Sequence, residues 1–131
     1  ATLTTYGVPG CIQDASVFAL GQGAACEDEI AAPFRRRRAL AQQVLAGQNT
    51  VGLIPAQGAM YLMLDVRATG LSGEDFANAL LDRHHIAVMP GESFGAAAAG
   101  HVRVAMTIED TAFEAALRTL CSFAEQRANA T

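Results

Sequence analysis

Arg103 is the residue whose type and position most directly suggest binding chemistry. It lies in a run from His101 to Met106 that alternates like a strand, so its side chain is predicted on the face opposite Val102 and Val104. A guanidinium held on a rigid strand can bind a carboxylate through two parallel hydrogen bonds. The same pattern also fits an ordinary exposed arginine or a structural ion pair, and alternation by itself favours that second interpretation. His101 shares the Arg103 face and is a candidate for the same site.

A second basic feature is the run of four arginines at positions 35–38. Such a run could form a phosphate or nucleic-acid patch. In a helix, however, four consecutive residues fan through about 300°, so they cannot serve one surface. The formal net charge of −4 also opposes non-specific nucleic-acid binding. We therefore expect solvated helix positions with partners such as Glu27, Asp28 and Glu29 or acidic residues elsewhere, and no nucleic-acid partner.

The composition excludes a lysine Schiff base and a cysteine zinc site. All 9 basic residues are arginine, so no lysine is present to form a Schiff base. The 3 cysteines are widely spaced, which excludes a cysteine zinc site and favours mostly buried thiols in a reducing, cytoplasmic compartment. His84 and His85 lie at a predicted helix end without a third ligand, so no metal site is expected. Met60, Met63 and Met89 are interpreted as core fillers.

Length and hydropathy fit a globular chain of about one domain. The sequence has 131 residues, of which 51% are apolar and 17% are charged. No stretch approaches about 18 uninterrupted apolar residues, so no membrane span is expected. The first residues lack the basic and apolar segments of a leader, so no signal peptide is expected.

The N-terminal third reads as helical. Residues 1–9 are predicted as an extended lead-in, followed by helices over 11–20 and about 24–46. Pro33 lies inside the second stretch. Because proline removes a backbone donor and clashes with the preceding turn, we expect a kink or two separate helices there.

The remainder alternates between strands and helices. The predicted strands cover residues 51–54, 60–66, 86–89 and 101–106. Ser72 with Asp75 begins one helix, and Thr107 with Asp110 begins the other. Residues 95–100 are predicted as a loose loop. This order predicts a two-layer α/β (α+β) fold, with helices on one face of a small mixed or antiparallel sheet. The open sheet face or the N-terminal helices are expected to pack against something outside the chain.

Four segments, in order, resemble one enzyme family. Residues 55–65 are similar to a strand of the fold-type I, class I/II aminotransferases that depend on pyridoxal phosphate, and 71–81 to the helix that follows it. Residues 88–95 resemble the family segment V-x-P-G-x-x-F-G, and 100–104 resemble its strand G-x-(V/I)-R-(I/L). Upstream, 6–9, 12–15 and the 35–38 helix look most like the arginine–pyruvate transaminase branch. The resemblance covers nearly the whole chain but only the C-terminal third of such an enzyme.

The resemblance implies roles for particular residues. Arg103 matches the arginine that binds the substrate α-carboxylate, and Phe94 and Gly95 match the turn that shapes that side of the site. The segment Gly58–Met60, which includes Ala59, matches a region near the substrate entrance. The catalytic lysine and the residues that bind pyridoxal phosphate are expected upstream of Ala1, so this chain would hold no cofactor covalently and would be inactive alone.

The resemblance also implies an organisation. Residues 1–47 would form the end of the large domain and the connecting helices, and 48–131 the small C-terminal domain. The partners would be an amino acid, a 2-oxo acid and the upstream cofactor domain. A homodimer is expected, with residues 1–10 near the partner subunit.

Two other functions fit the same fold. One is a non-enzymatic effector-binding or interaction domain, for example in a transcription regulator. The other is a lyase or synthase that uses the same cofactor. The substrate side chain is not readable from these residues.

Overall fold

The computed structural model describes residues 7–130. Two compact units divide at Pro33 and Phe34. The helices are α2 (Gly10–Leu20), α3 (Ala24–Leu45), α4 (Gly73–His84) and α5 (Asp110–Ala128). The strands are β1 (Gly52–Leu53), β2 (Tyr61–Asp65), β3 (Met89–Pro90) and β4 (His101–Ala105), and short 3-10 turns are η1 (Arg67–Thr69), η2 (Gly91–Phe94) and η3 (Ala96–Ala98). No helix in residues 7–130 is long and apolar enough to cross a bilayer.

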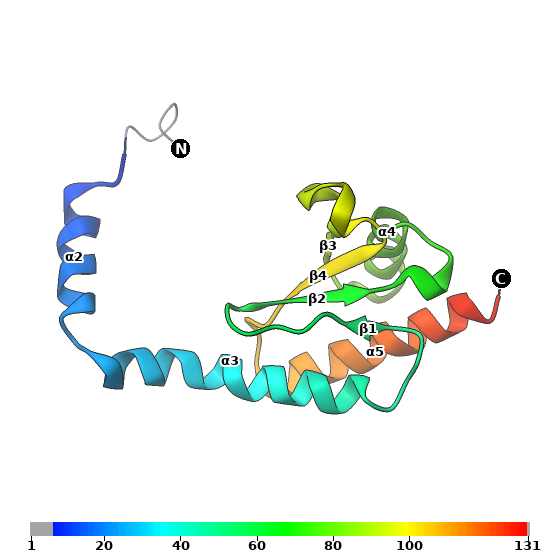
Figure 1. The fold of residues 1–131 in the computed structure, drawn as a ribbon, viewed down its shortest axis with the longest axis horizontal. Helices are drawn as coiled ribbons and strands as arrows, with labels where there is room; N and C mark the ends of the chain where they lie inside the picture. Colours follow the sequence, from blue (N-terminus) through cyan, green and yellow to red (C-terminus); the bar gives the residue numbers. More distant parts are fainter. Residues whose placement is uncertain (1–6, 131) are drawn as a thin grey trace. The chain divides into compact units, whose positions relative to one another are not determined.

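The sheet belongs to the second unit and is antiparallel throughout. Its strand order is β1-β2-β4-β3, so β4 is an inner strand (Figure 1). Leu62 and Leu64 of β2 lie opposite Val104 and Val102 of β4. These residues point to the same face because side chains alternate along a strand. The predicted two-layer α/β architecture is confirmed.

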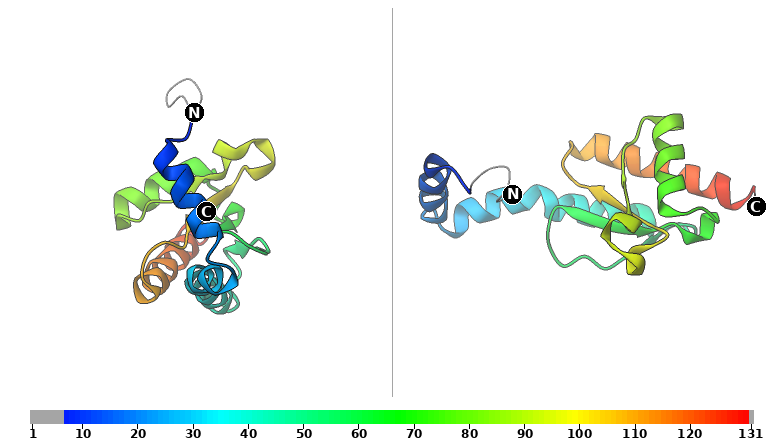
Figure 2. Two further views of the ribbon diagram at one scale, coloured as in Figure 1. Left: turned by 90° about the vertical axis from the view of Figure 1, so that its left-hand side faces the viewer. Right: turned by 90° about the horizontal axis from the view of Figure 1, so that it is seen from above.

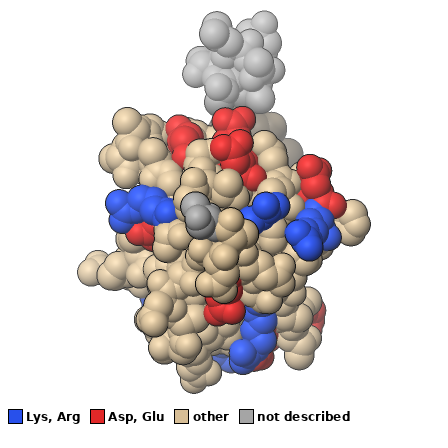
Figure 3. Space-filling model, turned by 90° about the vertical axis from the view of Figure 1, so that its right-hand side faces the viewer, with Lys and Arg blue, Asp and Glu red and all other residues tan. Residues whose placement is uncertain are grey.

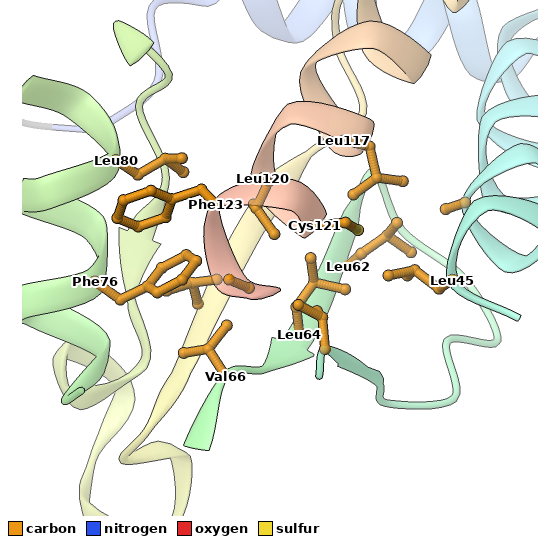
Figure 4. Packing of buried hydrophobic residues seen from close by; sticks show 14 of the residues in the cluster. Leu45, Leu62, Leu64, Val66, Phe76, Leu80, Leu117, Leu120, Cys121 and Phe123 are labelled. Atoms are coloured by element: carbon orange, nitrogen blue, oxygen red, sulfur yellow. The ribbon is translucent and has the colours of Figure 1, made fainter. Parts of the chain in front are cut away.

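The core lies between this sheet face and the helices. Phe76 and Leu80 of α4 face Phe123 and Leu120 of α5 (Figure 4). The Phe76 and Phe123 rings meet edge to face, with centroids 5.2 Å apart. Among residues 34–130, no α-helix covers the other sheet face, and its side chains are exposed or half-buried, as the sequence predicts (Figure 2).

The C-terminal half of α3 belongs to the second unit. It runs alongside α5 in the views of Figures 1 and 2 and contributes Ala41 and Leu45 to the core. Arg37 donates to Asp110 Oδ1 at 2.6 Å and to the Met106 carbonyl at 2.8 Å. Arginine side chains thus fasten this half of α3 to α5 and to the end of β4.

The first unit has little core of its own. Every residue of α2 is exposed, including Val17, Phe18 and Leu20. The sequence predicts either a kink or two helices at Pro33; α3 continues through Pro33 as a single helix, so the second of these alternatives is wrong. Proline removes one hydrogen bond but leaves the turns on either side complete. Residues 1–6 of the predicted lead-in over 1–9 lie outside the described residues.

Three local expectations also fail. The predicted 86–89 strand is confined to Met89 and Pro90, because the backbone ahead of Met89 is not paired with β4. Helix α5 begins at Asp110, so its N-cap position is Glu109 and not Thr107, and the Glu109 side chain makes no capping hydrogen bond. The segment 95–100 is not loose, since it contains η3 and is anchored at both ends. By contrast, Ser72 caps α4 as predicted, accepting from the Asp75 N–H at 3.0 Å.

Candidate functional site

The candidate site is built around Arg103 on the open face of the sheet. Arg103 lies in β4, with Met63 of β2 opposite it on one side and Met89 of β3 on the other. Its neighbours Val102 and Val104 face the helices, so the predicted orientation of Arg103 is observed. An inner strand paired on both sides gives the side chain a rigid base.

Two aromatic rings lie against the Arg103 guanidinium. The Arg103 Cζ atom lies 4.1 Å from the Tyr61 ring centroid and 4.8 Å from the Phe94 ring centroid. Cations are attracted to the faces of such rings. Arg103 Nη2 also donates to Met89 Sδ at 3.3 Å, a weak acceptor. Met89 is 41% exposed, so it touches the site rather than filling the core as predicted.

Within residues 7–130, no carboxylate lies within ion-pair distance of Arg103. Arg36 and Arg37 both pair with Asp110, and Arg67 pairs with Asp65. A guanidinium has five N–H donors, and only the Met89 sulfur accepts one from Arg103 in this part of the chain. The arrangement therefore suits an external acceptor with two oxygens, such as a carboxylate.

The predicted turn residues adjoin Arg103. Phe94 ends η2 and places its ring over the guanidinium. Gly95 follows with a φ of 105°, a conformation that favours glycine. A Cβ added at Gly95 would meet no atom within 4 Å, so this position needs glycine for its backbone angle and not for space.

The second predicted segment has no contact with Arg103 among the contacts that the structure records. Gly58 and Ala59 are exposed ahead of β2, and Ala59 adopts a φ of 63°. The Met60 carbonyl accepts from the Met106 N–H at 2.8 Å, which fixes the start of β2 beside the end of β4. These three positions immediately precede β2.

Tyr61 is the site residue that sequence reasoning missed. Alternation alone places Tyr61 on the face opposite Leu62 and Leu64, which is the face of Arg103. The missing information was the pairing of β2 with β4, which sets Tyr61 diagonally from Arg103. Residues two positions apart across paired strands are within reach of aromatic side chains.

Asp65 and His101 occupy the other end of this face, where they are cross-strand partners. The Arg67 guanidinium hydrogen-bonds the Asp65 carboxylate and lowers its pKa to about 2. His101 Nδ1 lies 2.9 Å from the Ala99 carbonyl. His101 therefore shares the face of Arg103 as predicted, but its recorded hydrogen bond is to the backbone.

The remaining candidates contribute no chemistry. Arg36 and Arg37 bond Asp110, and Arg38 donates to the Ala56 carbonyl at 3.3 Å, so these arginines are structural. No group of three His, Cys, Asp or Glu residues in 7–130 could hold a metal. On the described part of the face in Figure 3, acidic and basic side chains are interspersed without a continuous basic surface.

The cysteines differ in exposure. Cys121 is buried, and burial raises its pKa to about 11, whereas Cys26 is half-buried and Cys11 is exposed. The expectation of mostly buried thiols is therefore wrong for Cys11, because α2 buries none of its residues.

A separate pocket of about 370 Å³ lies on the helix side of the sheet, between segment 85–88, the end of β4 and the first half of α5. Its lining is mostly apolar and includes Val88, Phe113 and Leu117. Arg103 does not line it, so this apolar pocket and the Arg103 site lie on different sides of the sheet.

Comparison with known proteins identifies the family. Residues 2–120 match the family described as aminotransferase class I and II. The chain belongs to the class I and II aminotransferase family. It is 41% identical over 103 residues to the arginine–pyruvate transaminase AruH of Pseudomonas aeruginosa, which covers 79% of this chain and 26% of that protein. It is 31% identical over 114 residues to the LL-diaminopimelate aminotransferase of Oleidesulfovibrio alaskensis, covering 85% and 28%.

Solved aminotransferase structures share the fold. An aminotransferase from Staphylococcus aureus superposes with a TM-score of 0.80 at 28% identity, over 95% of this chain and 32% of that one. An aromatic aminotransferase from Pyrococcus horikoshii gives a TM-score of 0.70 at 29% identity, over 79% and 27%. The chain thus spans between a quarter and a third of the length of these relatives.

The family implies pyridoxal phosphate in full-length enzymes. The residues of this chain do not provide a covalent site for it, since the sequence contains no lysine.

Proposed function

We propose that this chain is the C-terminal part of a pyridoxal-phosphate-dependent aminotransferase, in which Arg103 binds the α-carboxylate of the amino acid and of the 2-oxo acid. The observation that carries the proposal is the Arg103 guanidinium, held on an inner strand against Tyr61 and Phe94 with no carboxylate partner in residues 7–130. The Arg103 match to the family strand, set out above, supports the same role.

The contribution of this chain is orientation. Two N–H groups of Arg103 would donate to the two carboxylate oxygens in one plane, which fixes both the position and the rotation of the substrate. Charge-assisted bonds of this kind also discriminate amino acids from simple amines. Pyridoxal phosphate, bound by upstream residues, supplies the electron sink of amino transfer.

Further parts of the proposal follow from the family. Gly58, Ala59 and Met60 would border the substrate entrance, and Gly95 would shape the turn beside Arg103. The full-length protein would be a cytoplasmic homodimer, and the 131-residue chain would be inactive by itself. Since AruH is named an arginine–pyruvate transaminase, arginine and pyruvate are the first substrate pair to assay.

The test measures kcat/KM for amino transfer by the full-length protein and compares the variant Arg103→Ala with the control variant Arg83→Ala. Arg83 lies exposed on α4 and serves as a matched arginine control. Arg103→Ala should lower kcat/KM by about 100- to 10,000-fold, because two hydrogen bonds to a charged group contribute about 1.5–3 kcal/mol each. The absorbance of the bound cofactor should not change. A variant with nearly normal kcat/KM would refute the role of Arg103.

A further inference from the structure

Glu92 joins three segments of the second unit through one carboxylate oxygen. Its Oε1 atom accepts the N–H of Gly73, the first residue of α4, at 2.9 Å. The same atom accepts the N–H of Gly100, which precedes β4, at 2.9 Å. Glu92 itself lies in η2, two residues ahead of Phe94. The side chain therefore links the beginning of α4, the beginning of β4 and the turn between β3 and β4.

The backbone around this carboxylate is closely packed. A Cβ added at Gly91 would collide with the carbonyl oxygens of Ala98 and His101, and one at Gly73 would collide with Glu92 Oε2 and the His101 carbonyl. Glycine at both positions permits this close approach. The Glu92 Oε2 atom is enclosed as well, with no hydrogen-bond partner in the described part of the chain.

The surroundings favour the ionised form of Glu92. The backbone N–H groups of Gly100, of Glu92 itself and of Gly73 lower the pKa of this carboxyl. Gly73 is also at the N-terminus of α4, where the helix dipole favours negative charge. Hydrogen bonds from N–H groups to an ionised oxygen are stronger than those to a neutral acceptor.

The Glu92 side chain is connected to Arg103 in two ways, through the beginning of β4 and through the turn that carries Phe94. Gly100 is three residues ahead of Arg103, so one bond of Glu92 fixes the start of the strand that carries the guanidinium. Phe94 is two residues beyond Glu92, and its ring lies 4.8 Å from Arg103 Cζ. Movement of the Glu92 turn would therefore shift the Phe94 ring relative to Arg103.

We propose that Glu92 is a positioning residue for the substrate carboxylate: it fastens the Phe94 turn to the beginning of β4 and so sets the orientation of the Arg103 guanidinium. The inference rests on the proposed function of Arg103. Glu92 occupies a variable position of the family segment V-x-P-G-x-x-F-G, and its two hydrogen bonds to Gly73 and Gly100 support the positioning role.

A double-mutant cycle in the full-length protein tests the proposal. Glu92→Ala is made with Arg103 present and in the Arg103→Ala background, and kcat/KM is measured for an amino acid substrate. With Arg103 present, Glu92→Ala should lower kcat/KM about 10-fold, since small displacements of a positioning group carry losses of this size or larger. In the Arg103→Ala background, the same change should have an effect of less than about 2-fold.

Controls separate positioning from stability. Glu74→Ala removes an exposed carboxylate from the first turn of the same helix and should leave kcat/KM unchanged in both backgrounds. Glu92→Gln keeps an oxygen that can accept both N–H groups, so this variant should fold even if Glu92→Ala does not. It should lower kcat/KM by about 3-fold, because only the charge is lost.

The outcomes distinguish the two proposals. If the Glu92 variants lower kcat/KM by the same factor in both backgrounds, the effect is structural and the positioning role is overturned. If they have no effect while Arg103→Ala does, the positioning role is also overturned and the proposed function stands. If Arg103→Ala alone has no effect, the proposed function fails and the role of Glu92 fails with it.

Discussion

The Arg103 guanidinium lies against two aromatic faces, and no carboxylate of residues 7–130 pairs with it. Tyr61 approaches it from β2, and Phe94 approaches from the turn ahead of β4. Such contacts orient a cation without neutralising it, which leaves its N–H edge available to a ligand. This is the property that a carboxylate-binding arginine requires.

Tyr61 is predicted to support substrate binding through its ring. Tyr61→Ala in the full-length protein should raise KM for the amino acid by about 2- to 10-fold, because a partly desolvated cation–π contact contributes about 0.5–1.5 kcal/mol. Tyr61→Phe keeps the ring and should leave KM within about 2-fold of the wild type. Steady-state kinetics at varied amino acid concentration measure the difference. Equal KM values for Tyr61→Ala and wild type would contradict this role.

At this site, the sequence could predict orientation but not contact. Alternation was sufficient to place Arg103 on the open face, because the period of a strand is local. It could not predict that Tyr61 lies beside Arg103, since that contact depends on the register between β2 and β4. The prediction of Met89 as a core residue is wrong, because Met89 lies on the edge strand β3 and its side chain is exposed there. The strand order that puts β3 at the edge is likewise not visible in the sequence.

Among the helices and strands, α3 and α5 illustrate how charged residues organise packing. The four consecutive arginines fan around α3, and Arg36 and Arg37 both reach Asp110 at the beginning of α5. The sequence excluded a shared phosphate patch, but the acidic partner lies about 73 positions away in the chain and no periodicity indicates it.

Asp110 should make the stability of the fold depend on pH. Hydrogen bonds from Arg37 and Arg36 lower the pKa of Asp110. A group whose pKa is lower in the folded state stabilises the fold above its ordinary pKa, about 3.9 for aspartate, and this contribution is lost as the pH falls through the lowered value. Wild type should therefore exceed Asp110→Asn in urea midpoint near pH 7, and the difference should shrink as the pH falls below about 3.9.

The neighbouring carboxylate provides a control for this prediction. Glu109→Gln removes an exposed charge that has no recorded bond to either arginine. Its urea midpoint should follow that of wild type across the same pH range. A difference between wild type and Asp110→Asn that is independent of pH would contradict the assignment.

Helix and strand order was readable from the sequence because each element carries its own apolar pattern. The Ser72 cap was readable as well, since a cap is a contact over three residues. The predicted start of α5 at Thr107 is wrong, because the chain bends at residue 108 and the helix begins only at Asp110. The 95–100 segment was misread as loose, because its order depends on Glu92 and on the close approach permitted by Gly91.

Considered as a whole, the chain concentrates its core in the second unit. The buried apolar cluster lies entirely within residues 41–124, and the described part of the first unit contains no buried residue. The apolar side chains of α2 are exposed, as expected for a helix that packs against a surface outside this chain. That packing remains a prediction.

Removal of the first unit should leave the second one folded. A chain that begins at Phe34 keeps every member of the buried cluster, so its free energy of unfolding should match that of the 131-residue chain within about 0.5 kcal/mol. Urea denaturation followed by circular dichroism measures this quantity. A large loss of cooperativity or a much lower midpoint would show that residues 1–33 contribute to the core.

The most direct test of the account is whether Arg103 recognises the substrate carboxylate. Full-length wild type and Arg103→Ala are compared for kcat/KM with an amino acid and with the amine that lacks only its α-carboxylate. We predict that the wild type favours the amino acid strongly and that Arg103→Ala loses most of this preference, while the two proteins act on the amine equally well. If Arg103→Ala kept the preference of the wild type, the carboxylate would be bound elsewhere and the proposed role of this chain would be contradicted.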